Sequence, residues 1–136
     1  YMLARIQHDE QEYSPYSRMC FLLTDRDIQY MFETIWNSQS ILSSNEDIYQ
    51  LHFVRWKKDE EWTPWNTILL TLDEAESHLK LTNLELSYGE QFTKKIKQKH
   101  VMARNYFSRL PNVSNYLNKA ESKGDLRLPS LTGVKI

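Results

Sequence analysis

The sequence has only one cysteine, Cys20, among its 136 residues. A single thiol cannot form an internal disulfide, and it cannot supply a zinc knuckle. We therefore expect the protein in a reducing intracellular compartment, which would be nuclear, cytoplasmic or organellar.

Glycine is also scarce, and Gly89, Gly124 and Gly133 stand far apart in the chain. Loops that cradle phosphate need several closely spaced glycines, so nucleotide-dependent catalysis is not expected. The histidines show no metal-binding spacing and are expected to be surface or half-buried residues rather than ligands: His8, His52, His78 and His100. We predict no cofactor, no metal ion and no catalytic residues. The alternative is an enzyme whose site is assembled from residues distant in the sequence.

Long hydrophobic runs are missing as well. No apolar stretch approaches the roughly 20 residues that a membrane span needs, and the first residues lack the pattern of a signal peptide. No membrane partner is expected. Because the chain starts at Tyr1, we interpret it as a processed product or a fragment of a longer protein.

The net charge of −1 hides a division along the chain. Residues 1–93 hold 7 basic and 16 acidic residues, whereas residues 94–136 hold 10 basic and 2 acidic ones. Such asymmetry indicates a basic segment that contacts nucleic acid or an acidic surface, or one that folds back onto its own acidic part. Both interpretations stay open.

Hydrophobic patterning predicts an α+β fold. The continuous apolar run at 19–23 favours a strand buried on both faces, and residues 48–56 are rich in β-formers. Thr24 and Asp27 resemble a capping box before a helix at 25–37. A weak alternation at 84–88 suggests a third, edge strand.

The second half of the chain is predicted to be mostly helical. Thr63 and Pro64 resemble a helix start, and helical spacing continues to about residue 80. The alternative there is a strand at 68–72 followed by a helix capped by Thr71 and Glu74. A long helix is expected at 90–110, ended by Pro111, with a short helix near 115–120.

The resulting prediction is a small mixed sheet of two to three strands covered by about three helices. Residues 1–121 form a single domain whose first 17 residues are an extended lead-in. Residues 122–136 form an irregular, basic tail.

The basic helix is the first candidate binding site. Seven cationic residues on or just after it could contact nucleic acid or an acidic protein: Lys94, Lys95, Lys97, Lys99, His100, Arg104 and Arg109. Helical geometry puts Lys95, Lys99 and His100 together and turns Phe92 and Ile96 inward. A cationic ridge of this kind would bind phosphates in a salt-dependent way. The alternative is an ordinary solvated helix face.

A group of aromatic residues forms the second candidate site. Because three tryptophans are hard to bury in a chain of this size, one or two are expected to be partly exposed, as in a peptide-binding cage. The alternative is that Trp56 and Trp65 belong to the core and Trp62 is a surface anchor. The candidate residues are Tyr49, Trp56, Trp62 and Trp65.

The segment 51–56, its charged turn and Trp65 resemble the centre of a chromodomain over about 20 residues. It departs from that family where Asn66 follows the second tryptophan and where a helix precedes the segment. The resemblance implies a peptide-reading module.

These observations together favour a non-catalytic interaction domain, a subunit or fragment of a larger assembly. Its basic C-terminal helix would contact nucleic acid or an acidic protein surface.

Overall fold

The computed structural model describes residues 1–14 and 16–122. These residues form a small α+β fold, 56% helical and 8% strand, around one two-stranded antiparallel sheet. The predicted fold class is confirmed, with more helix and less sheet than expected. The predicted tail lies outside the described residues except for Ser122.

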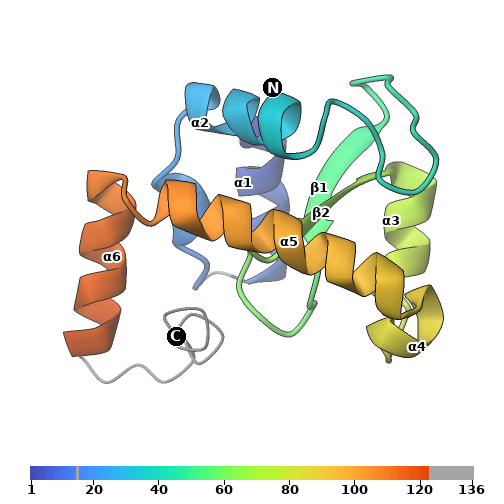
Figure 1. The fold of residues 1–136 in the computed structure, drawn as a ribbon. Coiled ribbons are helices and arrows are strands. Elements are labelled where there is room, and N and C mark those ends of the chain that lie inside the picture. The colour runs from blue at the N-terminus through green and yellow to red at the C-terminus, as the bar shows by residue number, and fades with distance from the viewer. Residues whose placement is uncertain (15, 123–136) are drawn as a thin grey trace.

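Figure 1 shows the helices and strands, with the longest connection, residues 36–50, running from η2 to β1. In order they are α1 (Met2–Tyr13), the 3₁₀ turn η1 (Met19–Phe21), α2 (Asp25–Tyr30), the π-helical turn η2 (Met31–Ile35), β1 (Leu51–Arg55), β2 (Thr67–Thr71), α3 (Leu72–Leu79), α4 (Leu84–Tyr88), α5 (Glu90–Phe107) and α6 (Pro111–Ser122).

The first 13 residues are helical, so the predicted extended lead-in is wrong. Met2, Ile6 and Glu10 are buried at four-residue spacing on one face of α1. The pattern was hidden because Glu10 is charged. Its carboxylate forms an ion pair at 2.6 Å with Arg55 on β1, which allows it to lie inside.

The strand predicted at 19–23 is also wrong. Met19 and Cys20 are buried, but η1 turns the chain and leaves Phe21 48% exposed. The backbone amides of Arg18 and Met19 donate to the Glu61 carboxylate at 2.7 and 2.9 Å. A carboxylate from a distant segment thus takes the place of a strand partner.

The helix predicted at 25–37 is confirmed by α2 and η2. Thr24 and Asp27 form the expected capping box, each side chain accepting a hydrogen bond from the other's backbone amide. Ile28, Met31 and Ile35 face the core from the same side of this segment.

β1 confirms the strand predicted at 48–56, and it pairs with a strand that was only the alternative interpretation. β2 runs antiparallel to β1, with Phe53 opposite Leu69, and α3 follows behind the capping box of Thr71 and Glu74. The helix predicted at 64–80 is therefore wrong. The apolar residues of this segment match both helical and strand spacing, because Ile68, Leu69 and Leu70 are consecutive and all fully buried.

The edge strand predicted at 84–88 is instead α4, which Asn83 caps and Gly89 ends. The long helix is confirmed as α5. Pro111 opens α6 rather than merely ending α5, and α6 contains the expected short helix. Val113 and Leu117 of α6 join the core beside Phe107.

Candidate functional site

The long helix α5 carries the first candidate site, and it crosses the front of the molecule from α4 to α6 (Figure 1). Ile96, Ala103 and Phe107 are completely buried and form its inner face. Phe92, which was also expected to pack inward, is partly buried against Tyr88 at a ring distance of 4.7 Å. These contacts fix which cationic side chains of α5 point inward and which point out.

Lys99 points inward. Its Nζ donates to the Ile35 carbonyl at 2.6 Å and lies 5.2 Å from the centre of the Trp36 ring. Burial lowers the pKa of Lys99, and the neighbouring charge of Lys95 lowers it further. The expected proximity of Lys95 and Lys99 is present, but Lys99 is used to hold α5 against η2.

His100 also points inward, and its ring lies 6.4 Å from the Trp36 ring. Its Nε2 lies 2.8 Å from the Thr67 carbonyl at the start of β2. Burial lowers the pKa of His100 to about 4. The ring is therefore neutral at pH 7, and its Nε2–H donates to that carbonyl. His100 joins α5 to the sheet instead of adding a positive charge to the surface.

Arg104 is the third inward cation. It is 9% exposed, and its guanidinium lies 4.9 Å from the centre of the Trp65 ring. Of the seven predicted binding residues, Lys99, His100 and Arg104 thus anchor α5 to the rest of the domain. This part of the basic segment folds back onto its own chain.

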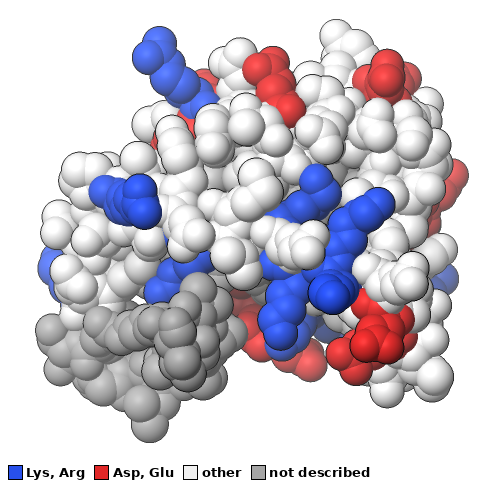
Figure 2. Space-filling model, in the orientation of Figure 1, with Lys and Arg blue, Asp and Glu red and all other residues white. Residues whose placement is uncertain are grey.

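The remaining four predicted residues are exposed to solvent. Lys94, Lys95 and Lys97 lie in the first half of α5, and Arg109 follows its end. Figure 2 shows basic side chains gathered over the first half of α5. The ion pairs shown between described residues, Glu10–Arg55 and Lys57–Glu60, do not involve these lysines.

The structure also places apolar side chains on the outer face of α5. Val101 and Met102 are 41% and 48% exposed, and Tyr106 stacks on Tyr30 at 4.0 Å while remaining 38% exposed. Sequence reasoning missed Val101 and Met102 as surface residues. The signal was available, because 100° per residue puts them away from the buried Ile96 and Ala103.

The aromatic candidate site is mostly buried. Trp56, Trp62 and Trp65 are 8%, 1% and 8% exposed, so the expectation that one or two would be partly exposed is wrong. Tyr49 is 74% exposed and precedes β1 in a separate loop. The four residues therefore do not converge on one open surface.

Internal partners already occupy the rings of Trp56 and Trp65. Trp56 stacks with His78 at 5.3 Å and with Tyr88 at 5.7 Å. Arg104 covers Trp65. The strand and charged turn that resemble a chromodomain do form a hairpin, but the Asn66 side chain closes its turn by binding the carbonyls of Lys57, Glu60 and Glu61.

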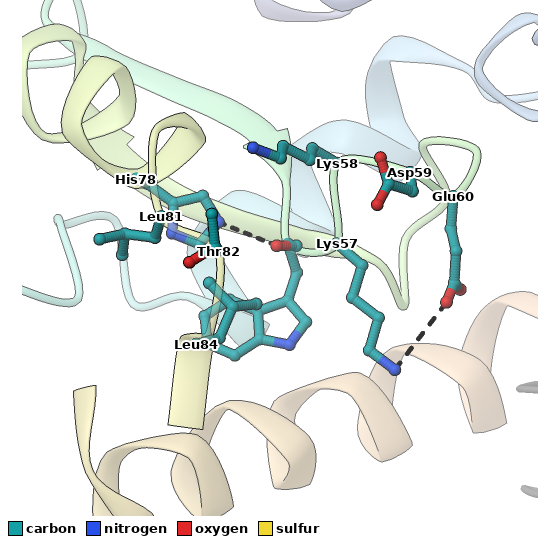
Figure 3. A pocket seen from close by; sticks show the side chains of 9 residues that line it. Lys57, Lys58, Asp59, Glu60, His78, Leu81, Thr82 and Leu84 are labelled. Carbon is teal, nitrogen blue, oxygen red and sulfur yellow. Dashed lines mark hydrogen bonds and ion pairs between the residues drawn. The ribbon is translucent and has the colours of Figure 1, made fainter. Parts of the chain in front are cut away.

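A pocket of about 180 Å³ lies between this hairpin turn and the connection from α3 to α4 (Figure 3). The turn contributes Lys57, Lys58, Asp59 and Glu60, the connection contributes Leu81 and Thr82, and α4 contributes its first residue, Leu84. Trp56 and His78 complete the lining. The pocket is thus lined by acidic and basic side chains and by a buried imidazole. A pocket with such titratable groups is where an enzyme's active site would be expected.

His78 is the titratable residue of the pocket with a shifted pKa, which burial lowers. Its Nε2 lies 2.9 Å from the Trp56 carbonyl, and its Nδ1 lies 2.7 Å from the Tyr88 hydroxyl. In the neutral ring Nε2–H donates to the carbonyl, so Nδ1 accepts a hydrogen bond from the Tyr88 hydroxyl. Both ring nitrogens have structural partners, and no lone pair is left to act as a general base.

The other histidines give no catalytic arrangement. His52 lies 2.9 Å from the Arg5 guanidinium, and burial followed by the charge of Arg5 lowers its pKa. His8 is exposed on α1. Within the described ranges no group of three His, Cys, Asp or Glu residues could hold a metal ion, and no described helix is long and apolar enough to cross a membrane.

No model of a known protein family matches the chain. The chain is similar to a mouse (Mus musculus) protein described as "IQ motif and ubiquitin-like domain-containing protein", with 44% identity over 126 residues. The similarity covers 93% of this chain but 16% of the mouse protein. The chain therefore spans about a sixth of the length of the relative it matches.

Proposed function

We propose that this chain is a non-catalytic protein-interaction domain of a larger assembly, and that it binds an acidic protein surface through the exposed face of α5. The observation that supports this most is that Lys94, Lys95 and Lys97 are exposed and lack an acidic partner among the described residues. Three exposed cations on one helix attract carboxylates and increase the association rate with an acidic partner.

The apolar residues next to these lysines favour a protein over nucleic acid as the partner. Val101 and Met102 lie one to two turns further along α5 and expose apolar surface. Protein interfaces bury such residues at their core and leave charges at the rim, whereas phosphate binding needs the charges alone. The name of the mouse relative refers to an IQ motif and a ubiquitin-like domain and to no enzymatic activity, which agrees with an interaction function.

The proposal can be tested by fluorescence anisotropy with two labelled probes. One is a peptide rich in glutamate and leucine, about 20 residues long so that it can follow the whole of α5 as a helix. The other is a single-stranded DNA of similar length. We expect the chain to bind the peptide, and we expect Lys94→Glu, Lys95→Glu and Lys97→Glu together to weaken binding by about tenfold or more.

A matched control reverses three exposed cations elsewhere, Arg26, Lys80 and Lys119, and should leave the affinity within about twofold because these charges lie outside α5. A second variant, Val101→Gln with Met102→Gln, separates the partner classes. It should weaken peptide binding but leave DNA binding unchanged. Equal loss in the control, or DNA binding without peptide binding, would contradict the proposal.

A further inference from the structure

The exposed surface of α5 is free of acidic residues over a long stretch. From residue 91 to residue 120 the chain has no Asp or Glu, although it contains seven Lys and Arg residues. We define the cationic face as Lys94, Lys95, Lys97, Val101 and Met102, all of which are exposed on α5. This face combines positive charge at one end with apolar surface at the other.

A second surface of the same molecule has the opposite composition. From residue 27 to residue 54 the chain has no Lys or Arg. We define the acidic face as Glu46, Asp47, Ile48, Tyr49 and Leu72. All five are exposed, and Ile48, Tyr49 and Leu72 are 42%, 74% and 51% exposed.

Hydrogen bonds give the acidic face a defined shape. The Asp47 carboxylate accepts from the Tyr49 amide at 3.0 Å, which fixes the loop around Ile48. The Leu72 amide donates to the Gln50 carbonyl at 3.1 Å, which joins the loop to the start of α3. The Ser40 hydroxyl donates to the Glu74 carboxylate at 2.6 Å and attaches the loop's other end to the same helix.

We propose that the acidic face of a second copy of this chain is a binding partner of the cationic face. This inference rests on the proposed function, because it identifies one acidic surface that α5 binds. Each face offers charges of one sign beside exposed apolar side chains, so pairing would bury apolar area and match opposite charges. The net charge of −1 leaves no long-range repulsion between copies.

The two faces belong to different elements, one to α5 and the other to the loop before β1 and the start of α3 (Figure 1). A contact between them is either reciprocal, so that both faces of each copy are buried in a closed dimer, or head-to-tail, so that one face of each kind stays open on the resulting pair. The average mass stops at that of a dimer in the first case and continues to rise with concentration in the second.

Sedimentation velocity of the purified chain tests this directly. The protein concentration is varied from about 10 to 300 µM, because complexes with small exposed interfaces have dissociation constants in the micromolar to millimolar range. We expect the average mass to rise above the monomer mass of 16.3 kDa at about 50 mM salt, and to fall back towards it at about 200 mM because salt screens exposed charges.

Two charge-reversed variants provide the decisive comparison. The first carries Lys94→Glu, Lys95→Glu and Lys97→Glu, and the second carries Glu46→Lys and Asp47→Lys. Each should be monomeric alone at every concentration, because its two faces then carry the same sign. An equimolar mixture should associate again, because each altered face finds an oppositely charged face on the other variant. Far-UV circular dichroism checks that both are folded.

A wild-type chain that stays monomeric throughout the concentration range would overturn the inference, as would a mixture of folded variants that does not associate. Neither result would affect the proposed function if the chain still binds the acidic peptide through Lys94, Lys95 and Lys97. Both proposals would be contradicted if the wild-type chain did not bind the acidic peptide and if neither charge-reversed variant changed the self-association.

Discussion

At the scale of single residues, the imidazole of His100 links the stability of the fold to pH. Its pKa of about 4 in the native state lies below the ordinary 6.5 because the ring is buried against β2. As the pH falls, the unfolded chain therefore takes up this proton before the folded chain does. The stabilising contribution is fully present above about pH 6.5, is lost as the pH falls to about 4, and does not decrease further below that.

We expect the free energy of unfolding to fall by about 2–3 kcal/mol between these pH values through His100 alone. His100→Gln keeps an amide donor for the Thr67 carbonyl and removes the titration. Urea denaturation of both proteins from pH 4 to 7.5 measures the difference, in which the similar contributions of His52 and His78 cancel. Identical pH dependence in the two proteins would show that His100 does not titrate as expected.

At the scale of secondary-structure elements, Gly89 determines how α4 and α5 are joined. Its φ of 90° and ψ of 160° belong to a region that is open almost only to glycine, and no atom lies within 4 Å of an added Cβ. A substitution here would therefore act through the backbone alone. Asn83 starts α4 only six residues earlier, so this glycine separates a five-residue helix from an 18-residue one.

We expect Gly89→Ala to lower the free energy of unfolding by about 1–3 kcal/mol, because alanine is strained at this φ and ψ. Ser87→Ala, an exposed position within α4, is the matched control and should change the stability by less than about 0.5 kcal/mol. Thermal unfolding followed by circular dichroism measures both. Equal stability of Gly89→Ala and the wild-type chain would mean that the junction adopts another conformation.

At the scale of the whole molecule, α1 packs against the core and is joined to the sheet through β1. Met2, Leu3 and Ile6 are buried in the core, and the Glu10 carboxylate receives two hydrogen bonds from Arg55, at 2.6 and 3.0 Å. Without α1 the buried guanidinium of Arg55 would lose its counter-charge, which costs about 3–5 kcal/mol in comparable cases. Small domains have a total stability of only about 5–15 kcal/mol.

We therefore expect a chain that lacks residues 1–13 to have no cooperative unfolding transition. His8→Ala with Glu12→Ala alters only exposed positions of α1 and should unfold like the wild-type chain. Near-UV circular dichroism and thermal melts compare the three proteins. A cooperative melt of the truncated chain would show that α1 is dispensable for folding.

Features that depend on neighbouring residues were predictable from the sequence. The capping box of Thr24 and Asp27 and the helix α5 appear where expected, because hydrogen bonds within a few residues form them. The segment of β1 was recognisable from its β-forming residues, although its hydrogen-bond partner β2 was not. The sequence also determined which residues are cationic, and that they are concentrated after residue 93.

Only the tertiary structure decided where those cations point. Lys99, His100 and Arg104 are as basic in the sequence as Lys94, Lys95 and Lys97, yet carbonyls and rings from η2, β2 and Trp65 bind the first three. In the same way, Glu10 could be buried only because Arg55 lies opposite it, and the apolar run at Ile68–Leu70 became a strand because β1 pairs with it. Contacts between residues 14 to 64 positions apart determine these outcomes, and local sequence patterns do not contain them.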